Sequence, residues 1–147
     1  MATSCAPSQH DGGGGYSSSD VAEALAELQQ VLAKHANDPL GMDGYLFEVH
    51  VWATFNFDAA AKGLPYRARR YADGAGGDVD IRVYDLRDGA TVKDAQLKTT
   101  GKHLFSYRYG AMDRVTTTTE HAHCRQHGVR GEAELSYGGA ASLPAPQ

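Results

Sequence analysis

The segment DVDIRVYDLRDGATVKDAQLK, residues 78–98, decides the fold that the sequence predicts. In its first half, Val79, Ile81 and Val83 alternate with polar residues, which is the two-residue period of a half-buried strand. Asp88-Gly89, near the middle, has strong turn chemistry, and a second short strand-like run follows it. The segment therefore predicts a β-hairpin.

Polar side chains on this hairpin suggest a site. Asp78 and Asp80 share one face of the first predicted strand, and Gln96 and Lys98 share one face of the second. If strand pairing brings the two faces together, a carboxylate, an amide oxygen and an ammonium group converge. Such a group could hold a divalent metal ion and attract a phosphate.

Length and composition predict one intracellular domain. The chain has 147 residues, of which 41% are apolar, enough for a single core. No apolar run approaches the roughly 18 residues that span a bilayer, and the N-terminus lacks the features of a signal peptide. We therefore expect no contact with a membrane. Cys5 and Cys124 form no disulfide framework and are expected to be free thiols.

The charge is unevenly distributed along the chain. The formal net charge is -4, but residues 62–114 hold 11 of the 14 Lys and Arg residues and only 7 of the 18 Asp and Glu residues. This segment therefore carries +4 and the remainder −8. A basic region around the hairpin is compatible with a nucleic-acid partner, although a solvated charged surface would give the same bias.

The ends of the chain frame a predicted domain over residues 19–137. Residues 1–18 and 138–147 are rich in small and polar residues and are predicted to be disordered tails. Ser19-Asp20 is predicted to cap a helix over residues 21–32. The apolar stripe of this helix is expected to pack on the domain; it consists of Val21, Leu25, Leu28 and Leu32.

Residues 44–57 predict a buried helix because apolar side chains lie on nearly every side at helical pitch. A strand from Glu48 to Phe57 is the alternative, and a short helix capped by Asn56 or Asp58 is expected to follow. Glu48 falls among aromatic residues, and a buried carboxylate must be protonated, paired or bound to a metal. Glu48 is therefore either the structural partner of an arginine or a contributor to the hairpin site.

Basic residues on both sides of the hairpin are candidate contacts for a substrate. Arg67, Arg69 and Arg70 are interleaved with Tyr66, Ala68 and Tyr71, which is compatible with an edge that contacts phosphates or with an edge strand protected by charge. Lys102 and His103 follow the hairpin closely and could also touch substrate, with a plain surface role as the alternative for His103.

The C-terminal part predicts a strand at 115–119, a helix at 120–127 capped by Thr119 and ended by Gly128, and a last strand at 132–137. The helix carries four soft-metal ligands: His121, His123, Cys124 and His127. His123 and His127 are one turn apart and could begin a zinc site, but the other two lie on a different part of the helix. An exposed polar helix is the alternative.

The order of these elements resembles the PD-(D/E)XK nuclease superfamily. A helix with Glu48 precedes a strand with Asp80, a hairpin, and Gln96-x-Lys98; the glutamine variant is similar to Mrr-like restriction endonucleases. The resemblance implies a restriction-endonuclease-like α/β fold, a single compact domain whose central mixed β-sheet is flanked by helices. It also implies that Glu48, Asp80 and Gln96 bind Mg²⁺ or Mn²⁺ and that Lys98 completes the catalytic set, with Asp78 as the alternative strand acid.

The function expected from this resemblance is metal-dependent hydrolysis of nucleic acid, with DNA as the favoured substrate. Cleavage of both strands by one active site per chain would call for a homodimer. Two other classes stay open. One is a binding or interaction module that keeps the fold without cutting, and the other is an interaction protein stabilised by zinc on the helix at residues 120–127.

Overall fold

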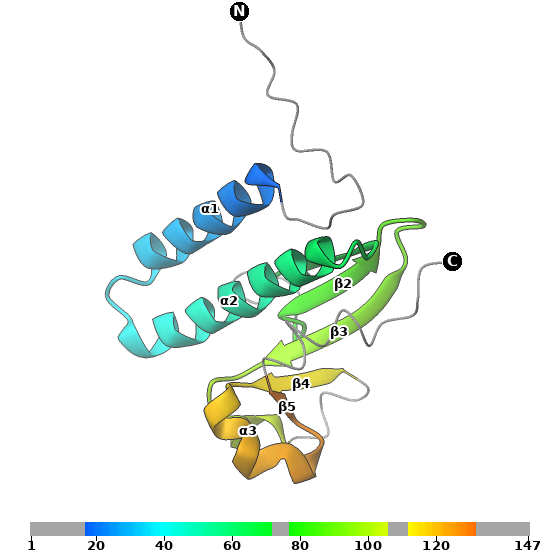
Figure 1. The fold of residues 1–147 in the computed structure, drawn as a ribbon. Helices are drawn as coiled ribbons and strands as arrows, with labels where there is room; N and C mark the ends of the chain where they lie inside the picture. Colours follow the sequence, from blue (N-terminus) through cyan, green and yellow to red (C-terminus); the bar gives the residue numbers. More distant parts are fainter. Residues whose placement is uncertain (1–16, 72–76, 106–111, 132–147) are drawn as a thin grey trace, which may run out of the picture.

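The computed structural model describes residues 17–71, 77–105 and 112–131. Within these residues the chain forms a small α/β domain with a five-stranded mixed sheet and three α-helices (Figure 1). The predicted fold class is confirmed. Residues 1–16, the tail from residue 138 and the strand expected at 132–137 lie outside the described residues.

The strands follow the chain order across the sheet: β1 (Tyr66–Arg70), β2 (Ile81–Asp85), β3 (Thr91–Leu97), β4 (Asp113–Thr116) and β5 (Arg130–Gly131). β1, β2 and β3 are antiparallel neighbours, whereas β4 is parallel to β3 and β5 is parallel to β4. The predicted hairpin is β2–β3. Its strands are shorter than predicted, so that Asp80 lies directly before β2 and Lys98 directly after β3.

Two antiparallel helices, α1 (Ser18–Lys34) and α2 (Pro39–Ala61), lie along one side of the sheet (Figure 1). α1 begins earlier than predicted, because Ser17 and Asp20 form a capping box in which each side chain accepts a hydrogen bond from the other's backbone N–H. Among the described residues, no helix is long and apolar enough to cross a membrane.

Residues 39–61 form one continuous helix, so the strand alternative and the separate short helix are both wrong. Asn56, expected as a possible cap, instead binds the backbone of Ala68 in β1. Its Oδ1 accepts from the Ala68 N–H at 2.7 Å, and its Nδ2 donates to the Ala68 carbonyl at 3.1 Å. Trp52 Nε1 donates to the same carbonyl at 2.9 Å. These bonds satisfy backbone groups on the outer edge of β1 that would otherwise be unpaired.

The main core lies between α2 and the first three strands. Val51 and Phe55 of α2 are completely buried, and Ile81 and Val83 of β2 are nearly so. The alternation that predicted the hairpin is thus confirmed, since Val79 is buried as well. A second, smaller cluster (Leu104, Cys124 and Val129) lies beneath α3 (Thr118–Cys124).

The predicted packing of α1 is wrong in part. Val31 is its buried apolar residue, and Ala24 and Leu28 are partly buried against the core. Val21, Leu25 and Leu32 are exposed. The helix is rotated about its own axis relative to the predicted orientation, so that its acidic residues face β1. There Asp20 pairs with Arg67, and Glu27 pairs with Arg70. Three of the four stripe residues therefore face outward.

The C-terminal elements begin slightly earlier than predicted. β4 ends at Thr116, and Thr117, not Thr119, caps α3 by accepting a bond from the Glu120 N–H. The short 3-10 turn η4 (Arg125–His127) follows and ends at Gly128, whose φ of 75° favours glycine. Arg114 ties this turn to another 3-10 turn, η2 (Gly101–Leu104), by donating to the carbonyls of His127 and Leu104.

Candidate metal and phosphodiester site

The end of the β2–β3 hairpin fixes Asp80 against the Gln96-x-Lys98 segment. The last paired residues are Ile81 and Ala95, and the N–H of Asp80 donates to the Ala95 carbonyl at 2.9 Å. The Asp80 carboxylate then accepts a hydrogen bond from the N–H of Leu97 at 2.8 Å. This bond holds the carboxylate against the backbone between Gln96 and Lys98, and the Lys98 charge opposes the rise that burial causes in the pKa of Asp80.

Gln96 and Lys98 flank a residue that belongs to the core. Ala95 and Leu97 pack in the main cluster, so the Gln96 side chain leaves the opposite side of β3. It is nevertheless only 4% exposed, and its Oε1 has no hydrogen-bond partner. The N–H of Lys98 donates to the Val115 carbonyl of β4 at 3.0 Å, which fixes the backbone from which the half-buried lysine projects.

The Glu48 side chain extends from α2 to within electrostatic reach of Asp80 and Lys98. It is 8% exposed, and its Oε2 lies 3.2 Å from Nε of Arg70 without forming an aligned hydrogen bond. Arg70 also donates from Nη1 to Glu27 of α1 at 3.0 Å. Both interpretations of Glu48 therefore describe part of its surroundings: it is paired with an arginine, and it lies beside the hairpin residues.

The two carboxylates share one electrostatic environment. Burial raises the pKa of Glu48 from 4.5 to about 8, and the negative charge of Asp80 adds to this shift, while Arg70 and Lys98 oppose it. Burial also raises the pKa of Asp80, opposed by the Leu97 N–H, Lys98 and Arg70. The structure thus brings Glu48, Asp80 and Lys98 within mutual electrostatic reach.

Asp78 lies near this group but in a different role. Its charge raises the pKa of Asp80, so it adds negative potential to the site. Asp80 is the residue anchored by the Leu97 N–H. This contact favours Asp80 over Asp78 as the acid contributed by the hairpin.

The carboxylates of Glu48 and Asp80 could hold a hard divalent cation, whereas the contacts do not place the Gln96 side chain beside them. Glu48 Oε2 and Gln96 Oε1 are buried oxygens without hydrogen-bond partners, and Asp80 keeps one oxygen beyond the one that accepts from Leu97. Mg²⁺ and Mn²⁺ prefer such oxygen ligands and usually retain several waters, so two carboxylates suffice. A bound cation would also offset the burial of two like charges.

The five predicted substrate-binding residues lie in different surroundings. Arg67 pairs with Asp20 and, at 3.5 Å, with Glu23, and Arg70 is buried between Glu27 and Glu48. Arg69 is exposed and lies 5.3 Å from the centre of the Tyr71 ring.

The other two follow β3. His103 is exposed, and the side chain of Lys102 lies outside the described part of the chain. Of the four whose side chains are described, Arg69 and His103 are open to solvent, whereas Arg67 and Arg70 are engaged by acidic residues of the helices.

The helix expected to carry zinc offers no converging ligands. Cys124 is buried, and its Sγ donates to the Glu120 carbonyl at 3.1 Å. His127 stacks on Phe105 with ring centres 4.0 Å apart. Within the described residues, no three His, Cys, Asp or Glu side chains are placed to hold one metal ion. The zinc alternative gains no support from this geometry.

The sequence did not identify the link from α1 to the site. Arg70 joins Glu27 of α1 to Glu48 of α2, although the sequence placed it among residues that contact substrate. Its buried position could have been suspected only from the alternation of β1, in which Tyr66 and Ala68 also face the core.

Comparisons with protein-family models, curated proteins and solved structures find no match to this chain. The interpretation of the site therefore rests on its own geometry.

Proposed function

We propose that this protein is a magnesium-dependent nuclease that hydrolyses phosphodiester bonds inside the cell, with DNA as its favoured substrate. One observation carries the proposal: the buried carboxylate of Glu48, one oxygen of which has no hydrogen-bond partner, lies within electrostatic reach of Asp80 and Lys98. Arg70 Nε lies 3.2 Å from this oxygen but forms no aligned hydrogen bond with it, and leaving a buried acceptor without a hydrogen bond costs roughly 1–3 kcal/mol, which favours a bound ligand.

Each residue has a defined task in this proposal. The carboxylates of Glu48 and Asp80 hold the cation, which when bound would polarise the phosphate and lower the pKa of an attacking water. The Leu97 N–H keeps the Asp80 carboxylate in place. The Lys98 ammonium stabilises negative charge on the phosphate oxygens.

Arg70 supports Glu48 rather than the substrate. Its guanidinium lies against Glu48 and favours the ionised carboxylate, which is the form that binds a cation. Glu27 holds the other side of the guanidinium through the 3.0 Å bond. Arg70 is therefore a positioning residue in the proposed mechanism.

The test is cleavage of labelled single- and double-stranded DNA, and of RNA, with Mg²⁺, Mn²⁺ or a chelator. Wild type is compared with Lys98→Ala and with Lys62→Ala, a control that removes an exposed lysine paired with Asp58 at the end of α2. We expect metal-dependent products from wild type and the control, and none from Lys98→Ala. Cleavage retained by Lys98→Ala would exclude the proposed role of this lysine.

A binding module without cleavage is the second candidate. The pKa of Glu48, which burial raises to about 8, favours it, because a carboxyl that is protonated near neutral pH is a poor ligand for a metal ion. Salt-sensitive DNA binding by wild type and Lys98→Ala alike, without products in any metal, would select this candidate.

A further inference from the structure

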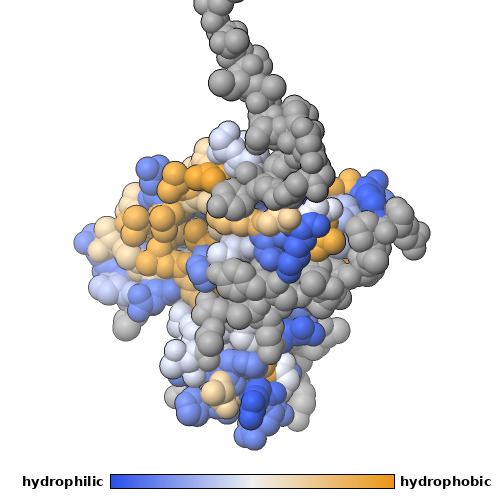
Figure 2. All heavy atoms as spheres, viewed as in Figure 1, coloured by the Kyte–Doolittle hydropathy of each residue, from blue (hydrophilic) through white to orange (hydrophobic). Residues whose placement is uncertain are grey.

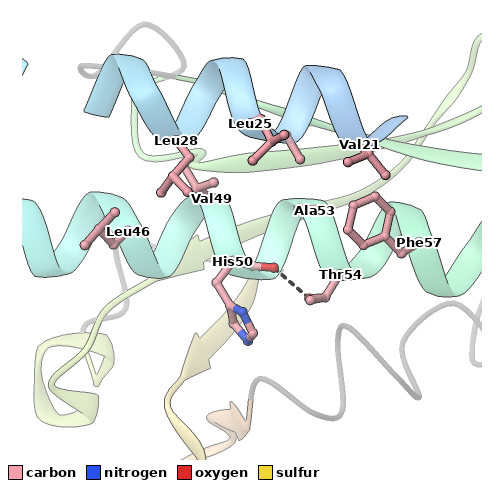
Figure 3. Close-up of a pocket in the computed structure, with 10 residues that line it drawn as sticks. Val21, Leu25, Leu28, Leu46, Val49, His50, Ala53, Thr54 and Phe57 are labelled. Atoms are coloured by element: carbon pink, nitrogen blue, oxygen red, sulfur yellow. Dashed lines mark hydrogen bonds between the residues drawn. The ribbon is translucent and has the colours of Figure 1, made fainter. Parts of the chain in front are cut away.

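A groove with apolar walls runs between α1 and α2, on the side of the molecule away from the strands. The residues that line it are Val21, Ala24, Leu25 and Leu28 from α1, and Leu46, Val49, His50, Ala53, Thr54 and Phe57 from α2 (Figure 3). The space-filling view shows hydrophobic residues gathered over these two helices (Figure 2). The floor of the groove is part of the core, since Val49 and Ala53 are buried.

Three large apolar residues of α1 are exposed, and two of them, Val21 and Leu25, line the groove. Val21, Leu25 and Leu32 are 37%, 52% and 44% exposed. With Leu28 they are spaced by four, three and four residues, the spacing at which a helix presents one apolar seam to a second helix. This seam is partly turned away from the domain to which α1 belongs. It therefore presents apolar surface suited to another helix.

The face that continues outward from this seam carries no charge. Its exposed residues are Ala22, Ala26, Gln29 and Ala33. The acidic residues of α1 lie on the other side, where Asp20 and Glu23 pair with Arg67 and Glu27 pairs with Arg70. Among the described residues, no Asp, Glu, Lys or Arg lines the groove itself. A symmetric dimer places a surface against its own copy, so a neutral surface meets no like-charge repulsion there.

We propose that this face is the interface of a homodimer, in which α1 of each copy lies in the groove of the other. Leu25 is the central contact, because it is the most exposed residue of the seam and also lines the groove. Small residues beside it (Ala22 and Ala26) permit close approach of the two helices. One continuous surface thus supplies both the inserting residue and the receiving groove.

The size of the face predicts a moderate affinity. At about 1.5 Å per residue α1 is roughly 25 Å long, and two helices side by side are roughly 20 Å wide, giving about 500 Å² per copy. This is smaller than the roughly 800 Å² that each partner buries in a standard interface. We therefore expect a dissociation constant in the micromolar range. The inference is independent of the proposed nuclease function, although a dimer would supply two sites for cleavage of both strands.

Sedimentation equilibrium of the full chain, from about 1 to about 300 μM, tests the proposal. Wild type is compared with Leu25→Glu and with Leu86→Glu. Leu86 is a matched control because it is 62% exposed and lies in the β2–β3 turn, outside the groove. We expect wild type and Leu86→Glu to dimerise alike and Leu25→Glu to weaken the dimer at least about tenfold.

Two results would overturn the proposal: a wild-type chain that stays monomeric throughout this range, and a Leu25→Glu variant that dimerises as wild type does. Circular dichroism and thermal unfolding confirm that each variant is folded. Leu32→Glu, on the same seam and 44% exposed, replaces Leu25→Glu should that variant not fold. If wild type is monomeric, sedimentation with phosphatidylcholine vesicles distinguishes a lipid surface from another protein as the occupant.

Discussion

The outer edge of β1 and the open end of the β2–β3 hairpin differ in how completely their buried polar groups are hydrogen-bonded. At the β1 edge, the Asn56 amide satisfies both backbone groups of Ala68, and Trp52 adds a third bond. At the hairpin end, one oxygen of Glu48 and the amide oxygen of Gln96 are buried without hydrogen bonds. The first region minimises the cost of burying polar atoms, and the second does not.

Arg70 lies between the two regions and belongs to both. Its Nη1 makes a well-formed bond to Glu27, whereas its Nε faces Glu48 at 3.2 Å without an aligned hydrogen bond. An incompletely satisfied network in a low-dielectric interior is costly. The difference distinguishes an edge whose polar groups are satisfied within the protein from a hairpin end whose polar groups are not.

The largest expected effect is the loss of cleavage in Asp80→Asn. Asparagine keeps the shape and can still accept the Leu97 bond through its oxygen, but it removes the charge that holds a cation. We expect cleavage to fall by at least about 1,000-fold, roughly 4 kcal/mol in the activation free energy, with little change in Tm.

Asp94→Asn is the matched control for this change. Asp94 lies on β3 and pairs with Arg82 at 2.6 Å, and the side chains of both residues are partly exposed. Its loss should cost at most about 1 kcal/mol of stability and leave cleavage intact. Equal rates in the two variants would contradict the role assigned to Asp80.

Asn56→Ala tests the stability side of the comparison. The change removes the acceptor of the Ala68 N–H and one of the two donors to the Ala68 carbonyl, so that this carbonyl keeps only its bond from Trp52. It also opens a small cavity at the α2–β1 contact. We expect the free energy of unfolding to fall by about 2–4 kcal/mol in urea titrations. A loss below about 1 kcal/mol would show that the β1 edge does not depend on this side chain.

Much of the fold follows from local patterns in the sequence. The alternation from Val79 to Val83 and the turn at Asp88-Gly89 predicted the hairpin, because a strand with one buried face alternates whatever packs on it. The apolar character of residues 44–57 favoured a helix over a strand, and the structure agrees. These elements depend mainly on period, which the sequence contains in full.

The errors arise where the outcome depends on a distant partner. The apolar arc of α1 is wider than the face that the helix buries. Periodicity does not tell which part of this arc packs on the domain. The ion pair between Glu27 and Arg70 fixes the rotation of the helix about its axis. Asn56 has the same cap chemistry whether it ends a helix or binds a strand edge. Within the site, local spacing placed Asp80 opposite the Gln96-x-Lys98 segment, where the Leu97 N–H binds it, but the contact between Glu48 and Arg70 depends on how α2 packs on β1.

Glu48→Gln tests the hairpin end through pH. Glu48 has a folded pKa of about 8 against an ordinary value of 4.5, so between these values the folded chain binds more protons than the unfolded chain. Stability without metal should therefore fall as pH rises from about 5 to about 8, by roughly 1–3 kcal/mol from this residue. Glu48→Gln should be flatter across this window. Parallel pH profiles of urea unfolding would contradict the shift.

The smallest expected effect is that of Arg67→Ala, at the exposed end of the contact between α1 and β1. The Arg67 side chain is 35% exposed, so solvent and salt screen its pairing with Asp20 and Glu23. We expect a loss of about 1 kcal/mol or less in the free energy of unfolding, shrinking further at high salt. Arg70→Ala removes a side chain that is 4% exposed and leaves Glu48 without its cation, so it should cost several times more and persist in salt. If the two variants lost equal stability, the contrast between a screened ion pair at the edge and a buried one beside the site would not hold.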